Sequence, residues 1–234
     1  MSETFVRDTI EKLFFAQLKT VENCVTTLDF DSVVCVLKEL ISSDGSILTS
    51  GVGKSSYIAK KLSKMLVSYG IQSQFLSPMN SIHGDLGSVK AKDYCFLFSK
   101  SGNTSELIAL IPHLRFKKCL VVAVTCSKLS KLSAESDYHI YLPLDQENCP
   151  LGISPVSSSV LQLLFADTFA SAIASIQRID EFTYKKNHPS GDIGIRMACA
   201  ADLMRKAADC PCTGRSSSIL VAVQQLCSKG CAIS

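Results

Sequence analysis

The sequence has no long apolar run, no large excess of charge of either sign, and no internal repeat or low-complexity segment. Even the apolar run at residues 119–125 ends at Cys126-Ser127-Lys128, well short of the roughly 18 to 20 residues that a membrane span needs. The 24 lysine and arginine residues exceed the 21 acidic residues by only 3, too even a balance to indicate a polyanionic partner. We therefore expect neither a membrane nor a nucleic acid as partner.

We expect no secretory leader either, because residues 1–8 show no signal-peptide pattern. The 11 cysteines therefore do not indicate the disulfide framework of a short secreted chain, and we expect a reduced, cytoplasmic setting. Some thiols fall on or beside expected core elements, where a free thiol behaves as a small apolar side chain: Cys35, Cys95, Cys119 and Cys126. Others crowd residues 197–234 at spacings that structural zinc sites seldom use, so we expect no metal there: Cys199, Cys210, Cys212, Cys227 and Cys231.

The chain has 234 residues, 47% of them hydrophobic, which is enough to bury one large core. Apolar spacing predicts helices at 4–25 and 31–42, the first with one buried stripe. Short apolar runs then alternate with helical patterns, at 46–52, 73–77, 94–99, 119–125 and 139–144. Such near-continuous apolar runs are typical of parallel strands that crossover helices bury on both faces. We predict an α/β fold, a three-layer αβα sandwich around a five-stranded parallel sheet of the flavodoxin-like or Rossmann-like kind.

A domain boundary is expected near Met197. A long amphipathic helix at 157–178 completes the predicted sandwich, so residues 1–196 form one domain. Residues 197–234 hold too few elements for a second core, since pieces below about 40 residues usually need a staple. We expect them to be a tail or the truncated start of a further domain.

Small, polar residues follow the first predicted strand, at 50–56. Ligands bind at the carboxyl ends of strands in parallel α/β sheets, so this junction is a candidate site. A P-loop is excluded because the Walker pattern needs glycine where Leu48 stands, and the dinucleotide fingerprint fails at Ser56. The turn either presents backbone amides and the cation of Lys54 to an anionic ligand, or is only a tight turn with Lys54 in solvent.

A second polar junction, at 99–106, follows the third predicted strand and opens a helix. Hydroxyl groups and free amides at a helix start suit a phosphate dianion. Glu106 has two interpretations, since it is either a capping-box acid for Asn103 or a carboxylate held beside the ligand.

A third junction, at 147–159, is a polar loop that contains Pro and Gly and ends in three serines, which makes it more than a connector. Cys149 lies in this loop and is a candidate for sensitivity to thiol reagents. His83 and His188 stand in two further loops, and each histidine taken alone is more often a structural hydrogen-bonding residue than a catalyst.

Five motifs occur along the chain in the order GVGKS, HGDLG, SKSGNTSE, ENCPLGISPVSSS and NHPSGDIGIR. In this combination, over about residues 37–196, the chain resembles the sugar isomerase (SIS) domain family, and within it the arabinose-5-phosphate isomerases most closely. The residues from 198 onward resemble the start of the CBS motif that follows the SIS domain in many of these enzymes, and they end before a CBS pair is formed.

The resemblance implies a cytoplasmic homotetramer that needs no cofactor and interconverts D-ribulose 5-phosphate and D-arabinose 5-phosphate, the first step towards Kdo and lipopolysaccharide. By motif, it implies a catalytic set of Lys54, His83, Glu106, Glu147 and His188. It also implies substrate contacts from Gly53 and Ser55, and a phosphate site made of Ser99, Ser101, Gly102, Asn103, Thr104, Ser157, Ser158 and Ser159. The chain differs from the arabinose-5-phosphate isomerases at two motifs. It has SGNT at 101–104 where they have SGES or SGET, and HPSG at 188–191 where they have HPGG. Asn103 adjoins the expected phosphate, so the first departure bears on substrate preference.

Moving a carbonyl between C1 and C2 of a sugar phosphate requires a base that carries a proton through an enediol, and a group that stabilises the developing oxyanion. We assign the base to Glu147, with Glu106 as its competitor, and the stabilising cation to Lys54. His188 or His83 would move hydroxyl protons or aid ring opening, as the resemblance suggests.

Two alternatives to this enzyme remain open. SIS folds also serve as non-catalytic phosphosugar-binding modules in regulators, and fold does not fix function. Other isomerases of the family act on hexulose or heptose phosphates. A sensor would need the serine-rich cradle but not the acids, so the presence of Glu106 and Glu147 favours the enzyme.

Overall fold

The computed structural model describes residues 1–196 and 198–230 of the chain. The chain divides into two compact units, Met1–Asn187 and His188–Ser234. The boundary expected at residue 197 falls inside the second unit and stays a prediction, as does the CBS-like nature of residues 198–234. Cys231 lies outside the described residues.

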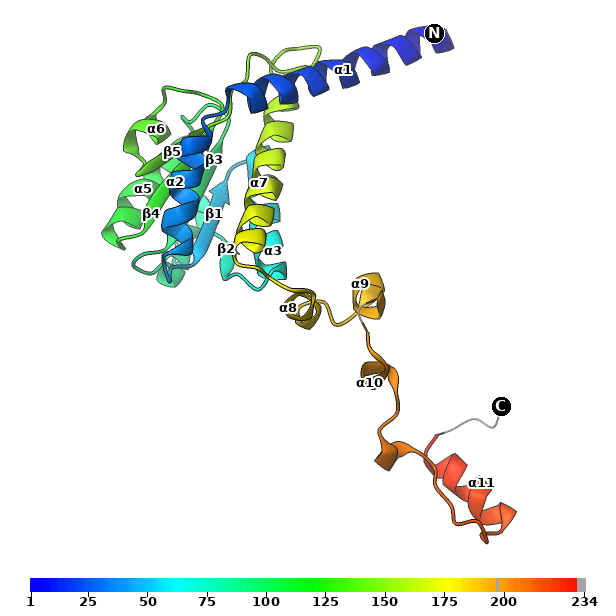
Figure 1. Cartoon of the computed structure of the whole chain (residues 1–234). Helices are drawn as coiled ribbons and strands as arrows, with labels where there is room; N and C mark the ends of the chain where they lie inside the picture. The colour runs from blue at the N-terminus through cyan, green and yellow to red at the C-terminus, as the bar shows by residue number, and fades with distance from the viewer. Residues whose placement is uncertain (197, 231–234) are drawn as a thin grey trace. The chain divides into compact units, whose positions relative to one another are not determined.

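The first unit is built on a sheet of five parallel strands in the order β2-β1-β3-β4-β5 (Figure 1). The strands are β1 (Ile47–Gly51), β2 (Ser73–Phe75), β3 (Tyr94–Ser99), β4 (Leu120–Thr125) and β5 (Tyr138–Tyr141). Every residue of β1 and β3 is buried, including the polar Thr49, Ser50 and Ser99, as is typical of central parallel strands that are covered on both faces. The predicted five-stranded parallel sheet is confirmed.

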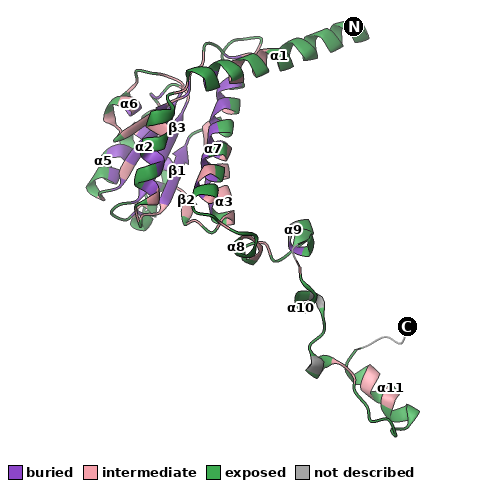
Figure 2. Cartoon of the chain, in the orientation of Figure 1, coloured by how far each residue is buried: buried purple, intermediate pink, exposed green. Residues whose placement is uncertain are grey.

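Long helices pack on one face of the sheet, namely α2 (Phe30–Ile41), α3 (Lys54–Ser68) and α7 (Ser157–Ile176), with α1 (Glu3–Thr27) against α7. Phenylalanines fill the layer between the sheet and α7. The ring centroids of Phe96 and Phe169 lie 5.1 Å apart, and those of Phe165 and Phe169 lie 5.4 Å apart. Figure 2 shows α7 buried along the side that faces the sheet. The first unit ends with the short helix α8 (Glu181–Lys186).

The opposite face is covered by α4 (Pro78–Ser81), the 3-10 turn η1 (Asp85–Ser88), α5 (Ser105–Phe116) and α6 (Lys131–Glu135). Leu97 and Val121 of the sheet pack there against Leu107, Leu110 and Leu114, all at most 1% exposed. Helices therefore flank the sheet on both sides, and the predicted three-layer αβα sandwich is confirmed.

Among the described residues, α7 is the one helix long and apolar enough to cross a membrane by length and composition. Its buried residues include Leu161, Phe165, Phe169 and Ile173, which belong to the core of the first unit. The apolar composition of α7 is therefore that of a central core helix.

Helix α1 departs from the expected single buried stripe, because Cys24 is its one buried residue. The N-terminal part of the helix extends away from the sheet (Figure 1), and Phe5, Ile10 and Phe14 are 60%, 50% and 69% exposed. The prediction of a helix is confirmed, whereas burial of the whole stripe within one chain is wrong.

The second unit consists of short helices joined by irregular segments: α9 (Gly191–Arg196), α10 (Ala200–Leu203), the 3-10 turn η2 (Ala207–Asp209) and α11 (Ile219–Ser228). Ile219 and Leu220 of α11 are 84% and 68% exposed. The described part of this unit thus leaves large apolar side chains in solvent.

Candidate active site

The candidate site lies at the carboxyl ends of β1 and β3. From β1 the chain moves to β2 on one side and then to β3 on the other, so the strand order reverses between β1 and β3. Ligands of open α/β sheets bind at such a switch point. The register pairs Gly51 with Phe98 and Ser99 with Thr125, so these strands end at nearly the same level. Two of the polar junctions therefore stand side by side.

The loop from β3 to α5 is held by its own hydroxyl groups. Ser99 Oγ accepts a hydrogen bond from the Gly102 N–H at 3.0 Å and lies 2.8 Å from Thr104 Oγ1. Ser101 Oγ accepts one from the Asn103 N–H at 3.2 Å. Helix α5 begins after Thr104 without a side-chain cap, which leaves N-terminal amides for an anion. These hydrogen bonds fix the turn, and its contact with a phosphate stays a prediction.

This loop also packs against the start of α6, a contact that the sequence does not predict. Gly102 has φ +64°, and a Cβ there would come 2.2 Å from Ser130 Oγ. The Gly102 carbonyl accepts a hydrogen bond from the Leu132 N–H at 2.9 Å, and Asn103 Oδ1 accepts one from the Lys131 N–H at 3.0 Å. Asn103 thus ties the loop to α6.

The capping-box interpretation of Glu106 is wrong, because Thr104 is the N-cap residue and Asn103 bonds elsewhere. Glu106 is partly buried in the first turn of α5, and its Oε2 accepts a hydrogen bond from Ser105 Oγ at 2.8 Å. Its own backbone N–H and the Ser105 hydroxyl lower the pKa of this carboxyl. Glu106 is therefore ionised at neutral pH and lies beside the cradle.

The turn from β1 to α3 is shaped by two glycines. Gly53 caps α3 with φ +59°, and a Cβ at Gly51 would come 2.9 Å from the backbone carbonyl carbon and oxygen of Ser55. Lys54 follows as the first residue of α3 and is exposed. Both interpretations of Lys54 therefore stay open, since a tight turn places its cation at a helix start and in solvent.

Glu147 is 4% exposed and caps α7. Its Oε2 accepts hydrogen bonds from the N–H groups of Val156, Ser157 and Ser158, at 2.9, 2.7 and 3.2 Å. Its Oε1 lies 2.9 Å from Lys100 Nζ. Burial raises the pKa of Glu147, but the Ser158 hydroxyl, the Lys100 ammonium and the N–H groups of Ser158 and Val156 outweigh burial and hold the pKa below its usual value.

The three serines that begin α7 have different surroundings. Ser157 and Ser158 are at most 1% exposed, and Ser157 Oγ accepts a hydrogen bond from the Asn148 N–H at 3.0 Å. Ser159 is less buried, and its Oγ donates to the Pro155 carbonyl at 2.7 Å. Ser157 and Ser158 are thus the first two residues of α7 and bond to Glu147, and their contact with a phosphate stays a prediction.

Two cavities flank the loop that carries Glu147. One, of about 470 Å³, brings together Ser101, Asn103 and Glu147 with residues that were not predicted for the site, among them Lys100, Cys126, Ser127 and Asp145. The other, of about 290 Å³, is lined by Lys54 and Ser159 with Tyr57 and Leu163. Predicted residues from three different junctions therefore meet around one loop.

Lys100 was missed because β3 and residue 147 are far apart in sequence, and only the fold brings the two side chains together. The single signal available was a cation inside the motif SKSGNTSE.

Of the two predicted histidines, His83 lies in the unit that holds these cavities. His83 is exposed in the turn between α4 and η1 and is not among the residues that line either cavity. His188 belongs to the second unit. Catalytic roles for both stay predictions.

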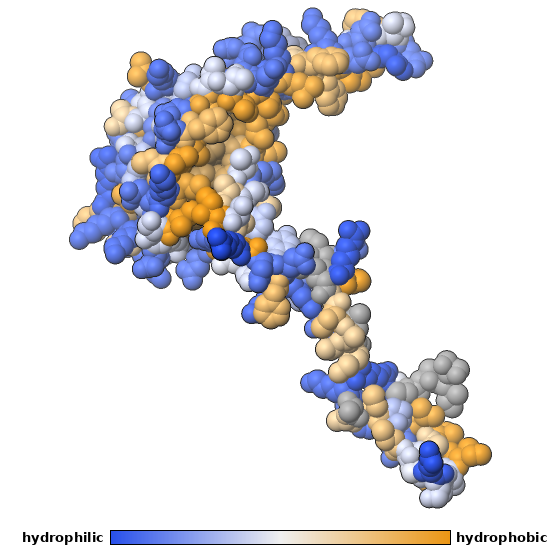
Figure 3. Space-filling model, viewed as in Figure 1, coloured by the Kyte–Doolittle hydropathy of each residue, from blue (hydrophilic) through white to orange (hydrophobic). Residues whose placement is uncertain are grey.

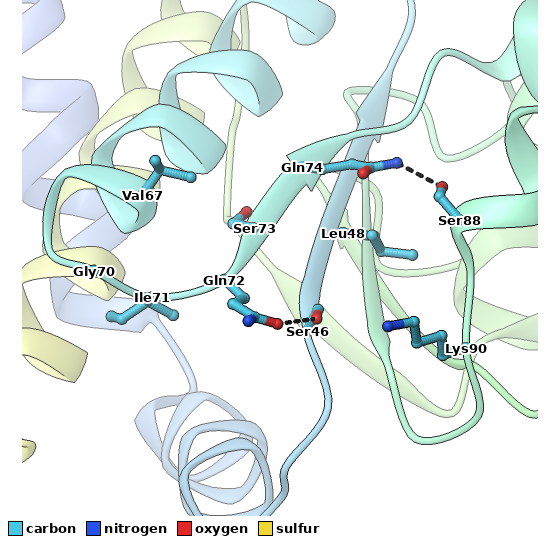
Figure 4. Close-up of a pocket in the computed structure, with 10 residues that line it drawn as sticks. All are labelled: Ser46, Leu48, Val67, Gly70, Ile71, Gln72, Ser73, Gln74, Ser88 and Lys90. Atoms are coloured by element: carbon cyan, nitrogen blue, oxygen red, sulfur yellow. Dashed lines mark hydrogen bonds between the residues drawn. The ribbon is translucent and has the colours of Figure 1, made fainter.

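A larger cavity, of about 540 Å³, lies beside the edge strand β2 (Figure 4). It opens near the amino ends of β1 and β2, where Ser46 Oγ donates to Gln72 Oε1 at 3.3 Å and Gln74 Nε2 donates to Ser88 Oγ at 2.6 Å. None of the predicted site residues lines this cavity. Because ligands bind at the opposite ends of the strands, we place the site elsewhere.

Within residues 1–196 and 198–230, no group of three His, Cys, Asp or Glu side chains is arranged to hold a metal ion. Cys149 is partly buried in the loop after Glu147, and its Sγ accepts a hydrogen bond from the Ser154 N–H at 3.2 Å. Burial raises the pKa of this thiol, but backbone N–H groups from Ser154, Leu151 and Ile153 bring the pKa below its usual value. The geometry favours the predicted sensitivity to thiol reagents.

Comparison with known proteins identifies the family of this chain. A family model described as the SIS domain matches residues 39–172. An uncharacterized protein of Chlamydia trachomatis is 37% identical over 184 residues, which cover 79% of this chain and 56% of the relative. The arabinose 5-phosphate isomerase GutQ of Escherichia coli K12 is 30% identical over 201 residues, which cover 86% of this chain and 63% of the relative. This chain thus spans little more than half the length of these curated relatives.

A solved structure shares the fold over the same region. It is an Escherichia coli CFT073 protein in complex with arabinose 5-phosphate, which superposes with a TM-score of 0.77 at 31% identity. The match covers 81% of this chain and 100% of the other chain.

Proposed function

Because this chain belongs to the SIS domain family, we propose that it is a sugar-phosphate isomerase that interconverts D-ribulose 5-phosphate and D-arabinose 5-phosphate. The similarity to GutQ and to the structure in complex with arabinose 5-phosphate supports the choice of substrate. The observation that carries the proposal is the cavity in which the Ser99–Thr104 loop meets the buried carboxylate of Glu147.

The phosphate of the substrate binds at the β3–α5 loop. The hydroxyl groups of Ser99, Ser101 and Thr104, with Gly102 and Asn103, hold the turn, and the uncapped start of α5 supplies amides. Ser159 and the buried Ser157 and Ser158 complete the phosphate site from α7. Gly53 and Ser55 contact the sugar from the start of α3.

Glu147 is the base that moves the proton between C1 and C2. Its low pKa keeps it ionised at neutral pH, and its hydrogen bonds to α7 fix its position. Lys54 stabilises the negative charge that develops on the enediol oxygen. Glu106 is the competing base, and His83 and His188 move hydroxyl protons or aid ring opening.

We also propose a cytoplasmic homotetramer that acts towards Kdo and lipopolysaccharide synthesis, with residues 197–234 as the start of a CBS-like region. The reaction needs no cofactor and no metal ion. Light scattering of the purified chain tests the tetramer.

The function is tested by incubating the purified protein with D-ribulose 5-phosphate in EDTA and identifying the product by NMR. We expect D-arabinose 5-phosphate. Tight binding without turnover would support a phosphosugar sensor instead, and turnover of a hexulose or heptose phosphate alone would support a different isomerase.

A further inference from the structure

Lys100 is the residue that follows β3, and it lies against the proposed base. Its Nζ is 2.9 Å from Glu147 Oε1. The Lys100 side chain is 39% exposed, whereas that of Glu147 is 1% exposed. The ion pair therefore joins a buried, fixed carboxylate to a lysine with room to move.

The two oxygens of Glu147 have different partners. Oε2 accepts the three N–H groups at the start of α7. Within the part of the chain that the structure describes, Oε1 accepts no further hydrogen bond, and Lys100 is its charged neighbour. Because an oxygen held by three N–H groups is a poor proton acceptor, Oε1 is the oxygen that can take a proton from a substrate. Lys100 stands in front of it.

The backbone of Lys100 is fixed, since its carbonyl accepts a hydrogen bond from the Cys126 N–H at 3.0 Å. Its side chain lines the same cavity as Ser101, Asn103 and Glu147. A phosphate held at the Ser99–Thr104 loop is therefore within reach of the flexible lysine stem. A phosphate dianion carries more charge than a carboxylate and offers more acceptor oxygens, so it competes for the ammonium.

We propose that Lys100 is a positioning residue that exchanges partners, pairing with Glu147 Oε1 in the absence of substrate and with the phosphate when a substrate is bound. The exchange uncovers the base only when a phosphate is present, so it makes the site selective for phosphorylated sugars. This inference deepens the proposed function and rests on it for the role of Glu147 as base.

The pairing with phosphate is tested by calorimetric titration of the full chain with inorganic phosphate. We expect Lys100→Met to weaken phosphate binding roughly tenfold, because a charge-assisted hydrogen bond is lost. Lys100→Arg should restore most of the affinity. Lys128→Met removes the same charge from an exposed position two residues after Cys126 and should leave the affinity unchanged.

The release of Glu147 is tested by carbon-13 NMR titration of its carboxyl group, assigned by comparison with Glu147→Gln. Without phosphate, Lys100→Met should show a higher pKa for Glu147 than the wild type. Saturating phosphate should raise the pKa of Glu147 in the wild type by more than in Lys100→Met, since only the wild type loses an ammonium neighbour. Lys128→Met should behave as the wild type does.

The inference is overturned if Lys100→Met binds phosphate as well as the wild type, or if phosphate shifts the Glu147 titration equally in both proteins. These readouts do not require turnover. If the phosphate titration and the NMR titration both gave the expected results but the wild type converted no sugar phosphate, the partner exchange would be supported and the proposed isomerase activity contradicted.

Discussion

Glu147 combines two tasks in one side chain. Its Oε2 accepts backbone hydrogen bonds at the N-terminus of α7, and its Oε1 pairs with Lys100. The motif ENCPLGISPVSSS is sufficient to predict that Glu147 is important, but a motif does not show that the serines after it donate their backbone N–H groups to this carboxylate. Lys100 is a case in which sequence spacing carries no information, because 47 positions separate residues 100 and 147 along the chain.

Replacing Glu147 with glutamine separates these tasks, because the amide oxygen still accepts from α7 whereas the base is lost. We expect Glu147→Gln to lower the rate of isomerisation at least roughly a hundredfold. The loss of charge at three hydrogen bonds should lower the free energy of unfolding by about 1 to 3 kcal/mol, measured in urea. Phosphate binding should persist.

Glu181→Gln, on the exposed first turn of α8, is the matched control and should change neither quantity. If Glu147→Gln retained turnover and Glu106→Gln lost it, Glu106 would be identified as the base.

At the scale of elements, the central strands β1, β3 and β4 could be predicted because each is a short run of mostly buried residues between helical patterns. The site-bearing loops could be placed because parallel strands end at a common edge. The packing of α6 on the β3–α5 loop could not be predicted, since α6 has only 5 residues and its contact with Gly102 depends on tertiary geometry.

That contact makes Gly102 a sensitive position. A Cβ in Gly102→Ala would clash with Ser130 and would force alanine into a left-handed conformation, so the phosphate loop must shift. We expect a loss of about 1 to 3 kcal/mol in the free energy of unfolding, together with weakened phosphate binding measured by calorimetry.

Gly87 serves as the comparison, because a Cβ there meets no atom within 4 Å and its φ is not positive. Gly87→Ala should unfold at nearly the same urea concentration as the wild type. If Gly102→Ala and Gly87→Ala unfolded at the same urea concentration, the account of Gly102 would be contradicted.

At the scale of the whole molecule, α1 stands out because its packed face continues into solvent. Val21 and Cys24 pack against the core, and Ile10 and Leu13 lie on the same side of the helix by their spacing but are 50% and 40% exposed. Figure 3 shows apolar surface along α1. The sequence pattern predicts the stripe correctly, but it does not distinguish burial within a chain from burial between chains.

We expect this stripe to be covered by a second copy, since the same stripe on two copies makes a self-complementary apolar contact. The double variant Ile10→Glu, Leu13→Glu should therefore have a lower mass by light scattering than the wild type. Lys12→Glu, an exposed change of charge on the same helix, should keep the wild-type mass. An unchanged mass in the double variant would exclude α1 as the contact between copies.

The central claim is that this chain moves a proton through an enediol of a pentose phosphate, and solvent isotope exchange tests it most directly. The purified wild type, incubated with D-ribulose 5-phosphate in deuterium oxide without added metal, should yield D-arabinose 5-phosphate that carries deuterium at C2. Substrate recovered unconsumed and free of deuterium, although bound, would contradict the claim.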